Sequence, residues 1–143
     1  MVDPPYADNV QYSELADFFY VWLKRTIGEI HPELLGQLLT DKENECVVNP
    51  VRDQDAGRYE KMMRQAMCEG RRVLVPDGIG VVVFAHKSTS GWEAQLQAMV
   101  DAGWIVTGSW PIDTEREGRL NAQDTAALAS SVHLVCRPRA DAE

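Results

Sequence analysis

Four consecutive residues near the start of the chain, Asp3, Pro4, Pro5 and Tyr6, could together hold a planar ligand. The carboxylate of Asp3 and the neighbouring backbone carbonyl are hydrogen-bond acceptors. The two prolines restrict the backbone around them, so both acceptors would be fixed before a ligand arrives. Tyr6 adds a flat face on which a ring can stack. A plainer interpretation is a solvent-exposed start in which Tyr6 only packs on the first helix.

The tetrapeptide resembles the catalytic tetrapeptide of S-adenosylmethionine-dependent amino-methyltransferases, which lies just after the fourth strand of their sheet. The resemblance implies that Asp3 and the carbonyl of Pro4 accept the two hydrogens of an exocyclic amine, so that its lone pair faces the donor methyl group. It also implies that Tyr6 stacks on a base swung out of the duplex. Because the sulfonium is already an activated leaving group, positioning would supply most of the catalysis.

The resemblance continues along nearly the whole chain. Segments 3–23, 43–52 (ENECVVNPVR), 82–88 (VVFAHKS), 109–115 (SWPIDTE) and 126–137 (AALASSVHLVCR) are similar to the family of zinc-ribbon-containing adenine-specific DNA methylases. This family implies adenine in DNA as the substrate and S-adenosylmethionine as the cofactor. RNA or another planar amine is an alternative substrate, because similar tetrapeptides serve several amines. A non-catalytic interaction subunit is the third interpretation.

Five further residues are candidate substrate contacts: Asn49, Arg52, His86, Lys87 and Ser88. The last three follow a predicted buried strand, and ligands of open α/β sheets gather at the carboxyl ends of strands. The first two would order a loop that faces the substrate. Turn chemistry or a solvated loop is the plainer interpretation of each. The cysteines form no CxxC pair, so neither a metal site nor a disulfide framework is predicted.

Hydrophobic spacing predicts the elements that would position these residues. Helices are expected over 13–27, 33–39, 55–74 and 90–102, an extended piece at 46–48, and strands over 79–85, 104–111 and 130–137. Residues 79–85 form a continuous β-branched run, which is typical of a strand buried on both faces of a parallel sheet. The order predicts an α/β fold: part of a doubly wound, Rossmann-like methyltransferase sheet with a C-terminal β-hairpin. A long mobile connection is expected at 113–129.

The 143 residues are expected to form a single domain, the C-terminal half of a methyltransferase catalytic domain. Related enzymes bind the donor through a glycine-containing loop after their first strand and an acidic residue after their second. Neither feature is evident, since Gly78 and Gly80 form a lone GxG with no strand before it. We therefore expect the isolated chain to be inactive, with the donor site completed by an N-terminal half or a partner chain. No fourth strand is expected to anchor Asp3.

Composition limits the partners. The net charge is −8, whereas a free-standing duplex binder usually presents a basic surface, so DNA would be attracted mainly by another part of the enzyme. No apolar run approaches the roughly 20 residues of a membrane span, and the start lacks a signal-peptide pattern, so a cytoplasmic protein is expected. Phe18, Phe19 and Trp22 would belong to the core of the whole fold; uncovered, they could drive formation of a homo-oligomer.

Overall fold

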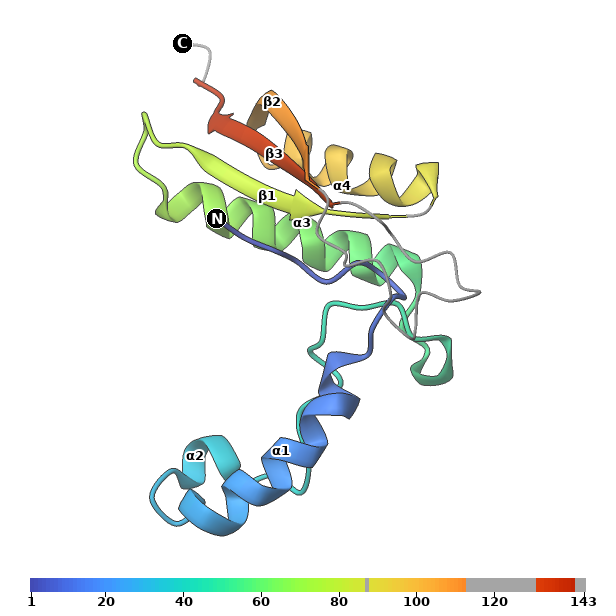
Figure 1. The fold of residues 1–143 in the computed structure, drawn as a ribbon, viewed down its shortest axis with the longest axis vertical. Helices are drawn as coiled ribbons and strands as arrows, with labels where there is room; N and C mark the ends of the chain where they lie inside the picture. Colours follow the sequence, from blue (N-terminus) through green and yellow to red (C-terminus); the bar gives the residue numbers. More distant parts are fainter. Residues whose placement is uncertain (87, 113–130, 141–143) are drawn as a thin grey trace.

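A computed structural model describes residues 1–86, 88–112 and 131–140. The elements in chain order are α1 (Tyr12–Ile27), α2 (Pro32–Leu35), the 3-10 helix η1 (Pro50–Arg52), α3 (Ala56–Val73), β1 (Gly80–Phe84), α4 (Thr89–Asp101), β2 (Trp104–Ile112) and β3 (Ser131–Pro138) (Figure 1). The predicted order of long helices and strands is confirmed. Segment 46–48, predicted as an extended piece of a loop, belongs to no helix or strand, and the connection predicted at 113–129 lies outside the described residues.

The three strands form one sheet in the order β1-β3-β2, and β3 is antiparallel to both neighbours. The consecutive strands β2 and β3 pair as the predicted C-terminal hairpin, and a bulge between Val106 and Gly108 shifts their register. A mixed α/β fold is therefore confirmed. Among the described residues, the parallel pairing expected for the strand over 79–85 is limited to one bridge, between Val2 and Val82.

That bridge anchors the chain immediately before Asp3. The N–H of Val2 donates to the carbonyl of Val81, and the N–H of Val83 donates to the carbonyl of Val2, both at 2.9 Å. The sequence predicted no strand in this place, because a single bridging residue leaves no hydrophobic pattern. Val2 nevertheless holds the start of the tetrapeptide alongside β1.

Helices α3 and α4 pack together against one face of the sheet. Asp55 caps α3 by accepting a hydrogen bond from the N–H of Arg58 at 2.7 Å. The buried core of this layer joins side chains of both helices to those of the three strands: Tyr59, Met63, Met67, Ala98, Met99, Val82, Trp104, Leu134 and Cys136. The indole of Trp104 also donates to the carbonyl of Met67 at 2.9 Å. Val82 thus fixes β1 in this layer of sheet and helices, called the platform below.

Helix α1 projects away from this platform and is tied to the segment that follows α2 (Figure 1). The N–H of Ser13 donates to Oε1 of Glu45 at 2.9 Å. The ammonium of Lys42 lies 2.7 Å from Oδ2 of Asp17, and the hydroxyl of Thr40 donates to Oδ1 of Asp17 at 2.6 Å. These bonds use the polar side of α1. Within the described residues, no helix combines the length and apolar composition that a membrane span requires.

The bonds to Asp17 predict an acid-sensitive attachment of α1. Hydrogen bonds from Lys42 and Thr40 lower the pKa of Asp17 from 3.8 to about 2. Because the folded pKa lies below the unfolded one, the stability from this carboxylate is complete above the unfolded value and is lost as pH falls through the folded value. The stability difference between the native chain and Asp17→Asn should therefore shrink between pH 3.8 and about 2. Urea unfolding followed by circular dichroism measures this difference, with Asp8→Asn as an exposed control. A difference that stays constant with pH would contradict the assignment.

Candidate functional site at the carboxyl end of β1

The tetrapeptide, called loop 3–6 below, leaves the sheet near the carboxyl end of β1. Val2 is paired with Val82, so Asp3 begins beside the last residues of the strand. The ring of Tyr6 contacts the ring of Phe84, with centroids 5.6 Å apart and an interplanar angle of 79°. Tyr6 therefore packs on the sheet, and the interpretation that it only packs on the first helix is not supported.

A hydrogen bond links the two ends of loop 3–6. The hydroxyl of Tyr6 donates to Oδ1 of Asp3 at 2.7 Å. Burial, followed by this hydrogen bond, raises the pKa of Tyr6 above its usual range, so the hydroxyl stays protonated and continues to donate. Asp3 is exposed, and its Oδ2 has no hydrogen-bond partner among the described residues. One carboxylate oxygen is thus held in place, while the other is open to a ligand.

Tyr59, in the first turn of α3, is hydrogen-bonded to the backbone of loop 3–6. This side chain is buried, and its hydroxyl donates to the carbonyl of Pro5 at 2.8 Å. Burial raises the pKa of Tyr59, and the backbone N–H of Ala7, directed at the same oxygen, opposes the rise. Tyr59 therefore meets the backbone on both sides of Tyr6. The sequence did not single it out, since a tyrosine at helical spacing is read only as a core residue.

The residue after the loop has an unusual backbone conformation. Ala7 has a φ of 50°, in the left-handed region that costs a residue with a Cβ about 1–2 kcal/mol. Its carbonyl accepts a hydrogen bond from the N–H of Val48 at 3.2 Å. The surrounding structure thus enforces the turn, and strain of this kind is often retained where it fixes a functional geometry.

Asn49 and Arg52, both predicted substrate contacts, have structural partners. The side chain of Asn49 accepts from the N–H of Val51 at 3.1 Å, and its backbone pairs with Gln54. Asn49 thereby orders the segment whose neighbouring residue, Val48, bonds to Ala7. The guanidinium of Arg52 lies 3.4 Å from Oε1 of Glu14 in α1.

His86 and Ser88 follow β1 and shape the turn into α4. The N–H of Ser88 donates to Nδ1 of His86 at 3.1 Å. The hydroxyl of Ser88 caps α4 by accepting from the N–H of Gly91 at 3.2 Å. A Cβ on Gly91 would overlap the imidazole of His86, so glycine is required for this close approach. Lys87, the third predicted contact in this segment, lies outside the described residues.

Phe84 is the fully buried centre of the site. The imidazole of His86 stacks on it at 6.2 Å between centroids, and the indole of Trp92 meets it edge-on at 5.1 Å. The indole N–H also donates to the carbonyl of His86 at 3.1 Å. The structure therefore joins Tyr6 and His86, which the sequence predicted, through Phe84 and Trp92, which it did not single out.

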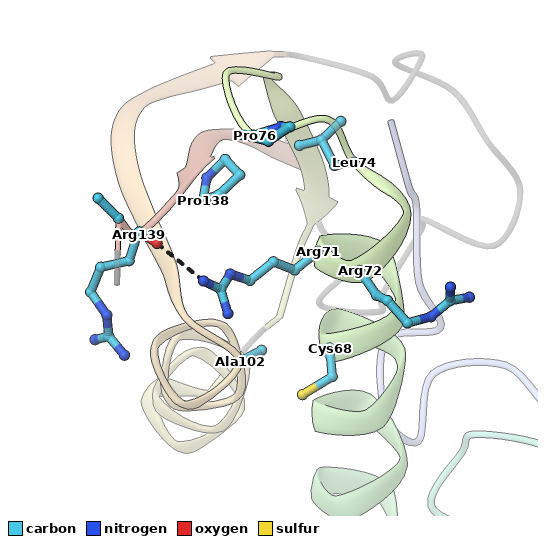
Figure 2. Close-up of a pocket in the computed structure, with 9 residues that line it drawn as sticks. Cys68, Arg71, Arg72, Leu74, Pro76, Ala102, Pro138 and Arg139 are labelled. Atoms are coloured by element: carbon cyan, nitrogen blue, oxygen red, sulfur yellow. Dashed lines mark hydrogen bonds between the residues drawn. The ribbon is translucent and has the colours of Figure 1, made fainter. Parts of the chain in front are cut away.

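A separate hollow of about 590 Å³ lies near the beginning of β1 and the end of β3 (Figure 2). Arg71 donates to the backbone carbonyl of Arg139 at 3.1 Å, and Arg72 pairs with Glu69 at 2.7 Å. In Figure 2 the guanidinium groups of Arg72 and Arg139 point away from the hollow. A bound anion would require guanidinium groups that point toward one position, and those of Arg72 and Arg139 do not.

Comparison of the chain with known protein families, with curated proteins and with solved structures finds no match. In the described part of the chain, no three His, Cys, Asp or Glu side chains are grouped as metal ligands. The function is therefore inferred from loop 3–6 and the side chains around it.

Proposed function

We propose that loop 3–6 holds adenine of DNA while S-adenosylmethionine transfers a methyl group to its exocyclic amine. The observation that carries this proposal is an open carboxylate oxygen beside an aromatic ring at the carboxyl end of β1. In the doubly wound sheet that this proposal assumes, ligands would bind at this end of the strands. The hydrogen bond from Tyr59 to the carbonyl of Pro5 supports the proposal, because it fixes loop 3–6, and a loop that positions a nucleophile must itself be fixed.

Each part of the loop has a role in this reaction. Oδ2 of Asp3 would accept one hydrogen of the amine, and the carbonyl of Pro4 would accept the other. Tyr6 would keep the carboxylate oriented and provide the stacking surface. When bound, S-adenosylmethionine would supply the methyl group to the amine nitrogen held by loop 3–6, with the electron pair of the broken carbon–sulfur bond returning to sulfur. The proton released from nitrogen leaves to solvent.

The strand directions are compatible with a larger doubly wound sheet. The bridge between Val2 and β1 is parallel. Both β1 and β2 are antiparallel to β3, so β1 and β2 point in the same direction. A doubly wound sheet continuing beyond Val2 would carry the donor-binding loop, supplied by an N-terminal half or a partner chain. The chain described here would then bind the base but not the donor.

Base binding by the purified chain tests the proposal. We expect a fluorescein-labelled oligothymidine strand with one central adenine to bind about tenfold more tightly than oligothymidine alone, since a hydrogen bond to a charged group is worth about 1.5–3 kcal/mol. Fluorescence anisotropy at low salt measures both affinities. Asp3→Ala should abolish the preference by removing the acceptor.

Asp8→Ala is the matched control, because Asp8 is also an exposed aspartate of the N-terminal segment. This variant should keep the full preference. Equal binding of both strands by the native chain would refute base recognition and favour the non-catalytic subunit. A stronger preference for the corresponding RNA strand would change the substrate from DNA to RNA.

A further inference from the structure

Helix α1 carries a large apolar surface that the described residues leave uncovered. Five side chains at helical spacing are between 47% and 66% exposed and form the surface called the α1 stripe: Leu15, Phe18, Phe19, Trp22 and Leu23. The helix projects away from the sheet and from α3 and α4 (Figure 1). Monomeric proteins rarely expose contiguous apolar patches of this kind.

Two leucines of the α1 stripe are placed symmetrically about Phe19. Leu15 and Leu23 lie at equal distances on either side of it along the helix. When a second α1 lies antiparallel with Phe19 at the crossing point, Leu15 of each copy meets Leu23 of the other. A two-fold interface requires this reciprocity, in which residue i contacts residue j and j contacts i.

The charges beside the stripe have the same symmetry. Glu14 and Arg25 lie at opposite ends of the stripe, about three helical turns apart, and therefore on the same flank of the helix. Equal flanks meet in an antiparallel helix pair, so Glu14 of each copy would lie near Arg25 of the other, in addition to its pair with Arg52 of its own chain at 3.4 Å. In a parallel pair, opposite flanks of the two helices meet, so Glu14 and Arg25 of the two copies would not pair.

We propose that the α1 stripe binds a second copy of this chain, forming a two-fold dimer through antiparallel α1 helices. Each aromatic side chain can bury about 150–250 Å², so the stripe offers on the order of 600 Å² per copy. A specific interface buries about 800 Å² per partner, and the flanking side chains supply the difference. The proposal is independent of the reaction assigned to loop 3–6.

Sedimentation equilibrium over a micromolar to millimolar dilution series tests the dimer. The native chain should be dimeric at the upper end. Phe19→Glu should make it monomeric with an unchanged circular dichroism spectrum, because Phe19 is exposed within the protomer. Val100→Glu, at an exposed apolar position of α4, is the matched control and should stay dimeric. A native chain that is monomeric throughout, or a dimer that Phe19→Glu leaves intact, would overturn the proposal.

Charge reversal tests the antiparallel arrangement. In a chain that carries Arg52→Ala throughout, which removes the partner of Glu14 within the protomer, Glu14→Arg and Arg25→Glu should each weaken the dimer about tenfold. The reason is that two symmetric ion pairs become repulsive. The double variant should regain native affinity, and so should a mixture of the two single variants, which restores opposite charges across the interface. Failure of both combinations to restore dimerisation would contradict antiparallel pairing.

Discussion

Phe84→Ala is expected to lower the free energy of unfolding by about 3–5 kcal/mol. The side chain is fully buried, and the rings of Tyr6, His86 and Trp92 all contact it. Its removal leaves a cavity that these neighbours fill only in part, because their backbones are held in loop 3–6, in the turn after β1 and in α4. Urea denaturation followed by circular dichroism measures the loss.

Phe18→Ala is the matched control, since Phe18 is 66% exposed on α1. Measured at a concentration where the chain is monomeric, this change should alter stability by about 0.5 kcal/mol or less. Total stability of such domains is about 5–15 kcal/mol, so Phe84→Ala can leave too little folded protein to study. Phe84→Leu then provides a smaller loss, and a result equal to Phe18→Ala would contradict the central role of Phe84.

Elements with local signals were predictable from the sequence. Helix α3 follows the capping residue Asp55 and has apolar residues at helical spacing, and β1 is a continuous apolar run. The direction of the strand was not encoded in that run. A strand buried on both faces can have parallel or antiparallel neighbours, and only long-range pairing placed β3 between β1 and β2.

The candidate site also has a part that the sequence predicts and a part that it does not. Asp3 and Tyr6 could be predicted as site residues because they belong to one tetrapeptide. The hydrogen bond between Tyr59 and Pro5 joins residues 54 positions apart, and no local sequence pattern predicts it. Likewise, the periodicity of α1 gives an apolar face but not what covers it, so Phe19 fits a core position and an interface position equally well.

Tyr59→Phe is expected to lower stability by about 1 kcal/mol, the low end of the cost of leaving an acceptor unsatisfied, because the hydrogen bond to Pro5 is part-buried. The larger consequence is functional. Without the hydroxyl, the carbonyl of Pro5 is released and the backbone on both sides of Tyr6 can move, so Asp3 and Tyr6 are no longer fixed relative to each other. Binding of the adenine strand should fall about tenfold, to the level of oligothymidine. Fluorescence anisotropy well below the unfolding temperature measures this change.

Tyr20→Phe is the matched control for the lost hydroxyl. Its hydroxyl also donates to a backbone carbonyl, that of Gln37, at 3.0 Å, but this bond is exposed and water can replace it. Tyr20→Phe should therefore leave both stability and the adenine preference nearly unchanged. Tyr59 has only a structural role if Tyr59→Phe lowers stability but keeps the adenine preference. If the native chain shows no preference, base recognition fails instead, and the two outcomes are distinct because stability and binding are measured on the same samples.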